Sequence, residues 1–170
     1  MKNFHLNHYE KAFGNWLVDN RVNYIAVDEQ KRAALGKANL KSFDYLLNLP
    51  NQPTIIAEVK GRKFKGKSFE KLASLECWVT IDDIDGLASW QDVLGTGHCA
   101  AFIFAYEIEN VDVDLDGRDA YDFGGITYMF FCIRLDEYRK FMKSRSPKWQ
   151  TVTIPADKFR KCAVQMQDIV

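Results

Sequence analysis

Residues 54–60 read TIIAEVK and place two opposite charges inside an apolar, β-branched run. Such a run predicts a strand that is buried for most of its length. Side chains alternate across a strand, so Glu58 and Lys60 point to one face, and Ala57 and Val59 point to the other. Two charges on one face of an inner strand are costly to bury unless they pair or bind a ligand. The segment is therefore the centre of a candidate site.

A third charge, Asp44, lies on the preceding predicted strand, residues 42–49. The turn at residues 50–53, PNQP, is short enough to join antiparallel neighbours. That pairing brings Asp44 within reach of Glu58. Two carboxylates so close repel each other, and a shared proton or a divalent cation relieves the repulsion. Mg²⁺ suits the pair because it takes few carboxylates and keeps waters for a substrate phosphate. Lys60 can then orient or deprotonate the attacking water, or stabilise charge as phosphate is displaced.

Asp44, followed fourteen positions later by Glu58-Val59-Lys60 at the end of an apolar strand, resembles the PD-(D/E)XK nuclease superfamily. The sequence departs from the motif at Phe43, where a proline is usual. The resemblance implies a restriction-endonuclease-like fold and hydrolysis of DNA phosphodiester bonds with Mg²⁺ or Mn²⁺. It also implies that Asp44, Glu58 and the backbone carbonyl of Val59 hold the metal and that Lys60 is catalytic. Structured or branched DNA is the expected substrate.

Glu10 is a further candidate metal ligand. It lies on the apolar stripe of a helix predicted over residues 6–20, where a carboxylate needs a reason. In the superfamily, a glutamate on the first helix often joins the site. The alternative is a capping box, because Asn7 precedes Glu10 by three residues. The segment His8–Phe13 also resembles an uncharacterised family named for the motif HYExAFE, with Gly14 in place of the final glutamate, and this resemblance brings no known activity.

The remaining patterns predict an α/β fold in which helices flank a central mixed sheet. The order is an α-β-β-β-α-β core followed by extra C-terminal strands and a helix, and 170 residues suit one domain spanning 1–170. Besides the segments above, the expected strands are 23–27, 78–81, 99–108, 126–135 and 150–154. The expected helices are a turn at 69–75, one from Asp82 or Asp83 to 94, one capped by Asp136 that runs to 143, and a last turn from Pro155.

The charge is balanced overall but unevenly distributed. The net charge is zero, which counts against a dedicated nucleic-acid binder. Residues 60–71, however, hold six basic residues against one acid. A basic loop predicted over residues 61–66 and its surroundings could lie along a phosphate backbone; the alternative is a solvated loop. The residues expected to contact DNA are Arg62, Lys63, Lys65 and Lys67. Gln91, on the helix that follows, is a candidate accessory residue.

The other motifs in the sequence give weaker functional evidence. Residues 112–117 copy the start of an EF-hand loop, but Phe123 stands where a bidentate glutamate is needed, so an acidic hairpin loop is expected. Of the three histidines, His5 and His8 are three residues apart, as two metal ligands on a helix can be, but no third ligand is evident. The four cysteines form no CxxC pair, which argues against a thiolate zinc site. The N-terminus lacks a signal-peptide core and no apolar run approaches membrane-spanning length, so a cytoplasmic protein without a membrane partner is expected.

The sequence therefore predicts a metal-dependent nuclease that acts on DNA. The alternative is a catalytically inactive nuclease-fold module that binds nucleic acid or a protein partner. A third interpretation is a structural protein whose acidic loop recruits a partner. The sequence leaves open endonuclease against exonuclease action, and a homodimer is among the alternatives for the oligomeric state.

Overall fold

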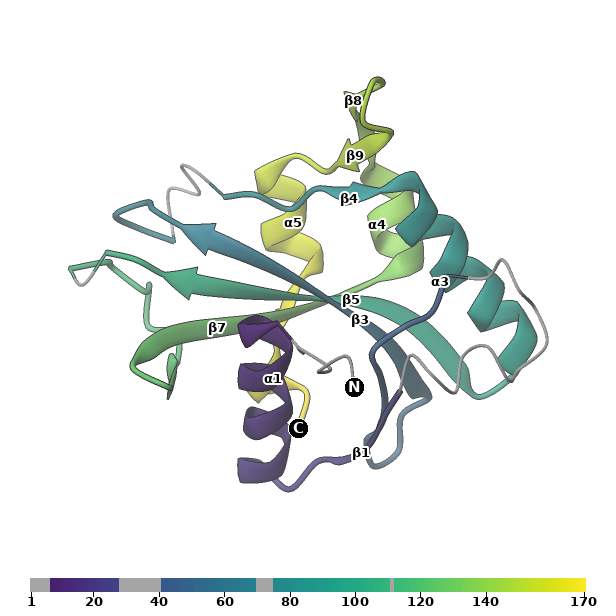
Figure 1. Ribbon diagram of the computed structural model, residues 1–170, viewed down its shortest axis with the longest axis horizontal. Helices are drawn as coiled ribbons and strands as arrows, with labels where there is room; N and C mark the ends of the chain where they lie inside the picture. The colour runs from purple at the N-terminus through teal and green to yellow at the C-terminus, as the bar shows by residue number, and fades with distance from the viewer. Residues whose placement is uncertain (1–6, 28–40, 70–74, 111) are drawn as a thin grey trace, which may run out of the picture.

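The structure is a computed structural model that describes residues 7–27, 41–69, 75–110 and 112–170 (Figure 1). Its central sheet has seven strands in the order β1-β2-β3-β5-β7-β10, with β6 paired to β7. Strands β3 and β5 are parallel and every other described pair is antiparallel, so the sheet is mixed. The strands are β1 Asn23–Ala26, β2 Tyr45–Asn48, β3 Thr54–Phe64, β5 His98–Ile108, β6 Tyr121–Phe123, β7 Ile126–Arg134 and β10 Val164–Gln165.

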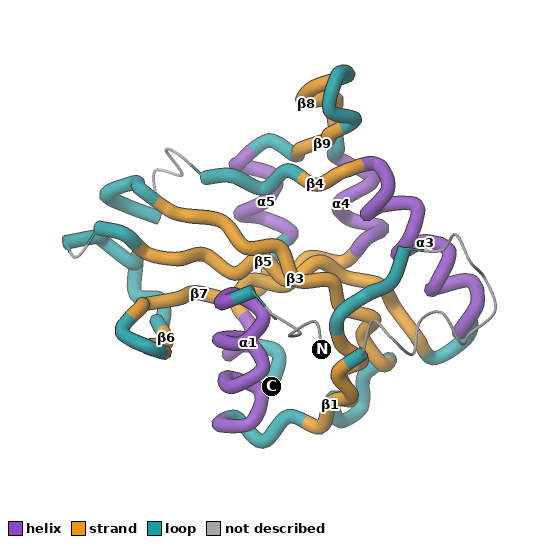
Figure 2. The backbone as a smooth tube through the Cα atoms, in the orientation of Figure 1, coloured by secondary structure: helices purple, strands orange, loops and turns teal. Residues whose placement is uncertain are grey.

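Helices cover both faces of this sheet (Figure 2). Helix α1 lies on one face, and α3, α4 and α5 lie on the other (Figure 1). A second, three-stranded sheet in the order β4-β9-β8 adjoins α3. The bounds are α1 His8–Asp19, α3 Ile81–Leu94, α4 Leu135–Phe141, α5 Ala156–Cys162, a short 3₁₀ helix Met166–Asp168, β4 Val79–Thr80, β8 Lys143–Ser146 and β9 Thr151–Thr153.

This architecture confirms the predicted mixed α/β class, in which helices flank a central mixed sheet (Figure 2). Of the helices that the structure describes, none combines the length and the apolar character needed to cross a bilayer.

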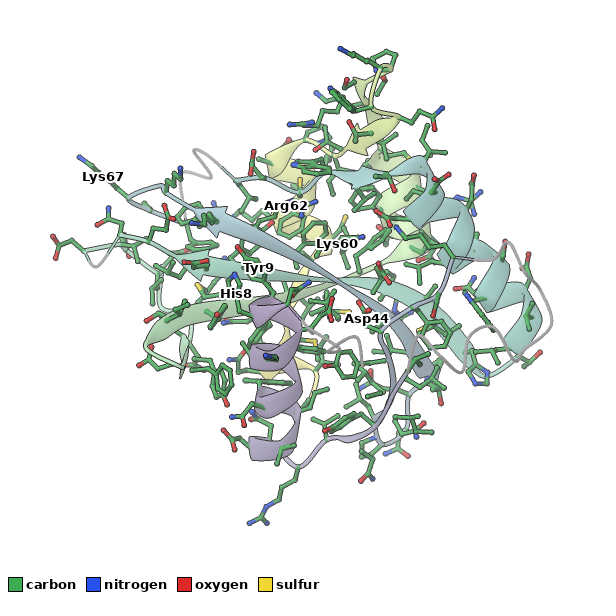
Figure 3. The ribbon with its side chains drawn as sticks, viewed as in Figure 1. His8, Tyr9, Asp44, Lys60, Arg62 and Lys67 are labelled. Atoms are coloured by element: carbon green, nitrogen blue, oxygen red, sulfur yellow. The ribbon has the colours of Figure 1, made fainter. Side chains whose placement is uncertain are left out.

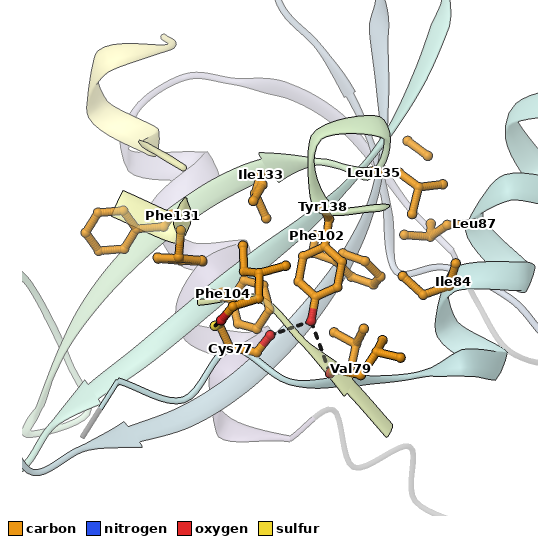
Figure 4. Close-up of a cluster of buried hydrophobic side chains, with 14 of the residues drawn as sticks. Cys77, Val79, Ile84, Leu87, Phe102, Phe104, Phe131, Ile133, Leu135 and Tyr138 are labelled. Carbon is orange, nitrogen blue, oxygen red and sulfur yellow. Dashed lines mark hydrogen bonds between the residues drawn. The ribbon is translucent and has the colours of Figure 1, made fainter. Parts of the chain in front are cut away.

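Two apolar cores lie on opposite faces of the sheet, and β3 contributes to both. Ile56 and Phe64 join the core beneath α3, α4 and α5, whereas Ala57 and Val59 join the core beneath α1. The first core is rich in aromatic rings, and inside it the Tyr138 hydroxyl donates a hydrogen bond of 2.6 Å to the carbonyl of Cys77 (Figure 4). The alternation of side chains along β3 therefore directs its even-numbered charges toward α3.

Helix α1 packs closely against β3. A Cβ atom added to Gly61 would lie only 2.0 Å from Cδ2 of the Tyr9 ring, so the strand needs glycine there for the helix to approach. The Tyr45 hydroxyl on β2 donates a 3.0 Å hydrogen bond to the carbonyl of Glu10. These contacts place the start of α1 beside the centre of β3.

Strand β3 is longer than the sequence predicts. It continues through residues 61–64, the first part of the expected basic loop, because it pairs with β5 along its whole length, from Thr54 opposite His98 to Phe64 opposite Ile108. The expectation of a loop there was wrong, since charged side chains at every second position can leave a strand while its backbone stays paired. Arg62 and Lys63 are thus strand residues.

Other boundaries also shift. Helix α3 begins at Ile81 and is capped by Thr80, two or three residues earlier than the predicted caps Asp82 and Asp83. Helix α4 begins at Leu135, so Asp136 lies in its first turn instead of capping it. The short strands β6, β8 and β10 were not predicted, because two to four residues show too little alternation to reveal a strand. Most of the predicted helical turn at residues 69–75 lies outside the described residues.

Candidate functional site

Asp44 immediately precedes β2 and lies close to Glu58 on β3. The last pair of the β2–β3 ladder is Tyr45 with Ala57, so Asp44, which was predicted to be a strand residue, lies just outside the ladder. The backbone N–H of Asp44 still donates to the Ala57 carbonyl at 2.9 Å. The negative charge of Asp44 raises the pKa of Glu58, so the two carboxylates lie close together.

The Asp44 side chain also contacts the backbone of β3. Its Oδ2 accepts a 2.8 Å hydrogen bond from the backbone N–H of Val59. The N–H and C=O of one strand residue point to the same edge of the strand. The Val59 carbonyl therefore points to the edge from which Asp44 approaches, just beyond the end of the β2–β3 ladder.

Lys60 lies between two carboxylates. Its Nζ is 3.0 Å from Oε1 of Glu58 and 2.9 Å from Oδ1 of Asp83 on α3. All three side chains are largely shielded from solvent, and Asp83 is only 4% exposed. Figure 3 shows Lys60 near the centre of the molecule, with Asp44 to one side of it. The sequence did not single out Asp83 as a site residue.

Asp83 is held by the start of its own helix. Its Oδ2 accepts a 2.9 Å hydrogen bond from the N–H of Thr80, and its own N–H donates to Oγ1 of Thr80 at 3.1 Å. These two bonds form a capping box. The Lys41 ammonium forms a further ion pair with Oδ1 of Asp83. A buried, doubly paired carboxylate thus anchors Lys60 to α3.

The same helix holds the segment that leads to Asp44. The Trp90 indole N–H donates a 2.8 Å hydrogen bond to the carbonyl of Lys41, and the ring of Phe43 meets that indole edge-on at 5.2 Å. Gly86 allows this approach, because a Cβ there would lie 3.0 Å from Cβ of Lys41. Helix α3 therefore positions both Asp44 and Lys60.

Burial and charge shift the pKa values of this cluster in different directions. Burial and the neighbouring Asp44 raise the pKa of Glu58 to about 7, against the opposing effect of Lys60. Burial alone would raise the pKa of Asp83, but the ammonium groups of Lys60 and Lys41 and the N–H of Thr80 lower it to about 2. Burial alone would lower the pKa of Lys60, but Glu58 and Asp83 raise it above its ordinary value. Lys60 is therefore an ammonium at neutral pH.

The raised pKa of Glu58 predicts a pH-dependent loss of stability. Because this pKa is near 7 in the folded protein and 4.5 in an ordinary, unperturbed glutamate, the folded state binds a proton more tightly between these limits. The contribution of Glu58 is present below about pH 4.5 and falls by roughly 3 kcal/mol as the pH rises to about 7. Glu58→Gln should therefore gain stability over the wild type as the pH rises. Urea unfolding across this range measures the difference, and parallel curves for the two proteins would contradict the assignment.

Glu10 does not join the two other carboxylates. It is the third residue of α1, where its N–H donates to Oδ1 of Asn7 at 2.9 Å and its Oε1 accepts from Nδ2 of Asn7 at 2.8 Å. Glu10 thus interacts with the capping residue, but its carboxylate bonds to the Asn7 side chain and not to the backbone N–H that a capping box would use. Helix α1 also lies on the opposite face of the sheet from Glu58. Among the described residues, no three His, Cys, Asp or Glu side chains are grouped so as to hold a metal ion.

The four basic residues expected to contact DNA lie in different environments. The guanidinium of Arg62 is 3.9 Å from the ring centroid of Trp78 and donates to the carbonyls of Gly61 and Trp78, so it is held inside the fold. Lys63 pairs with Glu109 at 3.0 Å. The two others, Lys65 and Lys67, are exposed, and Figure 3 shows Lys67 projecting away from the sheet while Lys60 and Arg62 lie within it.

Two more sequence candidates have structural partners. Oε1 of Gln91 accepts a 2.7 Å hydrogen bond from the N–H of Ala100, which ties the end of α3 to the start of β5. Gln91 is also eight residues beyond Asp83, or about 12 Å along the helix axis. His8, in the segment that resembles the HYExAFE family, bonds through Nδ1 to the Tyr128 hydroxyl at 2.8 Å on the α1 side of the sheet.

Comparisons with known proteins bear on the fold. No family model matches the chain, and no curated protein matches it. Among solved structures, the chain is similar to Hjc of Archaeoglobus fulgidus, a Holliday junction resolvase from an archaeal hyperthermophile. The match has a TM-score of 0.51 and 14% sequence identity, and it covers 94% of this chain and 97% of the other. At this identity, the likeness supports the restriction-endonuclease-like fold.

Proposed function

We propose that this protein is a metal-dependent nuclease of the PD-(D/E)XK type that hydrolyses DNA phosphodiester bonds. One observation carries the proposal: in a restriction-endonuclease-like sheet, the Asp44 carboxylate bonds to the backbone of β3 at Val59, between Glu58 and a buried Lys60. The similarity to a Holliday junction resolvase makes branched DNA the first substrate to test.

The donor set fits a hard divalent cation. Asp44 contacts the backbone of Val59 and lies close to Glu58, and all three residues can supply oxygen, the ligand that Mg²⁺ and Mn²⁺ prefer. The raised pKa of Glu58 means that Lys60 does not fully offset burial and the negative charge of Asp44, and a bound cation would stabilise the ionised carboxylate. Two carboxylates and a carbonyl leave coordination positions for waters and phosphate. We do not include Glu10 in this set, because its carboxylate interacts with the helix cap.

Each residue of the site then has a distinct task. When bound, the cation would supply an activated water and polarise the phosphate. The Lys60 ammonium, held by Asp83, would stabilise the negative charge that develops on the phosphate. Its raised pKa disfavours the other role considered for it, removal of a proton from water. The Asp83 pairing would keep Lys60 in place while Glu58 binds the cation.

One observation favours the alternative of a catalytically inactive module. Lys60 is already ion-paired with both Glu58 and Asp83, so a bound cation is not needed to give these carboxylates a partner. A buried ion network of this kind can serve the fold alone. In that case the protein would bind nucleic acid or a protein partner without cleaving DNA.

Cleavage and metal binding together separate these functions. The protein is incubated with Mg²⁺ or Mn²⁺ and with four-way junction, plasmid and single-stranded DNA, beside Asp44→Asn. We expect cleavage by the wild type alone. We also expect Mg²⁺ to raise the unfolding temperature of the wild type more than that of Asp44→Asn, because a ligand that binds the folded state stabilises it. If the wild type shows no cleavage and no stabilisation by the metal, the nuclease proposal is rejected.

A further inference from the structure

A basic hairpin projects from the molecule beside α3. Strands β8 and β9, with the turn between them, form what we call the β8–β9 arm, residues 143–153, and Figure 1 shows its tip standing clear of the central sheet. The turn is closed by a 3.2 Å hydrogen bond from the N–H of Gln150 to the carbonyl of Pro147, and Gln150 takes a positive φ of 49°. The N–H of Trp149 bonds to Oγ of Ser146. The tip is therefore a defined turn.

The arm carries positive charge that acidic residues do not balance. Residues 139–156 hold five basic residues and no acidic one. In the part of the chain that the structure describes, no carboxylate forms an ion pair with Lys143, Arg145 or Lys148. In a protein of zero net charge, this concentration is a local feature that complements a polyanion.

Aromatic rings lie among these charges. Trp149 at the tip is 67% exposed, the most exposed of the large hydrophobic residues in the described regions. The Lys148 ammonium is 5.2 Å from its ring centroid. At the base of the arm, the Arg145 guanidinium lies 4.9 Å from the ring of Trp78, over which Arg62 also stacks. Interleaved cations and aromatic rings are the groups that bind single-stranded nucleic acid, through phosphate contacts and base stacking.

The arm is connected to the candidate site by a short series of contacts. Thr151 pairs with Thr80, and the N–H of Ile81 donates a 2.9 Å hydrogen bond to the carbonyl of Gln150. Thr80 caps α3 through Asp83, which holds Lys60. Strand β9 of the arm is thus attached to the start of α3, which positions Lys60.

From these observations we infer that the β8–β9 arm binds an unpaired single-stranded segment of the DNA substrate next to the scissile site. Trp149 stacks on an unstacked base, and Lys143, Arg145 and Lys148 contact the phosphates on either side. A single-stranded partner fits better than a duplex, because an exposed indole needs a free base face. The inference rests on the proposed function in that it assigns the arm to the same substrate.

Binding without metal tests the arm separately from cleavage. Anisotropy of a fluorescein-labelled oligothymidylate is measured with the full chain in EDTA. Trp149→Ala should bind roughly 5- to 100-fold more weakly, and Trp149→Phe should restore much of the loss. The triple variant Lys143→Ala, Arg145→Ala, Lys148→Ala should reduce the slope of log K against log salt by about 2. Lys11→Ala, an exposed lysine on α1, is the control and should bind as the wild type does.

Three results would overturn the inference: no binding by the wild type in EDTA, unchanged affinity in Trp149→Ala, or stronger binding to an equivalent duplex than to the single strand. Oligonucleotide binding that depends on Trp149 in a protein that cuts no DNA would leave the arm standing and reject only the nuclease. If the protein cleaves DNA but substitutions in the arm leave oligonucleotide binding unchanged, the inference about the arm is rejected and the nuclease proposal stands.

Discussion

Asp83→Ala is expected to destabilise the fold by about 3 to 5 kcal/mol, the cost of removing one partner from a buried ion pair. Asp83 is 4% exposed and contacts the ammonium groups of Lys60 and Lys41. Without it, Lys60 keeps its ion pair with Glu58 but loses the one that ties it to α3. The substitution also removes the side-chain half of the capping box with Thr80.

Urea unfolding at neutral pH measures this change. Asp82→Ala is a matched control, because Asp82 is the neighbouring residue in the first turn of the same helix and is exposed. It should cost less than about 1 kcal/mol, the usual contribution of an exposed acid to the helix dipole. Equal losses in the two variants would show that Asp83 acts only through the helix end.

The lowered pKa of Asp83 gives this result a pH signature. Its pKa is about 2 in the folded protein, against 3.8 for an ordinary aspartate, so its contribution is present above about pH 4 and is lost as the pH falls toward 2. Asp83→Asn keeps the shape and removes the charge. The stability difference between Asp83→Asn and the wild type should therefore shrink between about pH 4 and 2.

Lys60→Met is expected to reduce DNA cleavage by roughly 100- to 1000-fold, the usual loss when one preorganised charge-stabilising group is removed. Methionine has a stem of similar length but no charge. Because Lys60 contacts Glu58 and Asp83, the rate should be measured where circular dichroism shows the variant folded. The assay uses single-turnover cleavage of the substrate that the wild type cuts.

Two further variants show whether the loss of cleavage is due to the missing positive charge of Lys60. Lys60→Arg retains the positive charge, so partial activity is expected if the ammonium acts electrostatically and not as a base. Lys11→Met removes an exposed lysine on the other side of the sheet and should cleave at the wild-type rate. A folded Lys60→Met that cleaves as fast as the wild type would remove Lys60 from the proposed mechanism.

The local pattern around β3 was sufficient to predict the central part of the fold. An apolar run, a proline-flanked turn and a preceding strand imply antiparallel neighbours, and this pairing occurs between β2 and β3. Asp44 lies just beyond this ladder, where its side chain accepts a hydrogen bond from the N–H of Val59. By contrast, the capping partner of Glu10 could be proposed only as an alternative, because a helix start is uncertain by several residues in a single sequence.

Asp83 shows where sequence reasoning ends. The spacing of Thr80 and Asp83 is a capping-box signal that could have been read along the chain. Its second role could not, because it depends on α3 crossing β3 at Lys60, and contacts between elements far apart in sequence leave no local pattern. For the same reason, Arg62 was expected at a DNA surface but packs on Trp78.

The sequence by itself determined the strand that bears Glu58 and Lys60, the turn that brings Asp44 beside it, and the mixed α/β class, because these depend on alternation and turn chemistry between near neighbours. The tertiary structure alone decided which charges meet. Lys60 reaches Asp83, Glu10 stays on the other face, and the β8–β9 arm adjoins the start of α3. These outcomes depend on how separate elements pack, and packing is set by the shape and burial of the whole core.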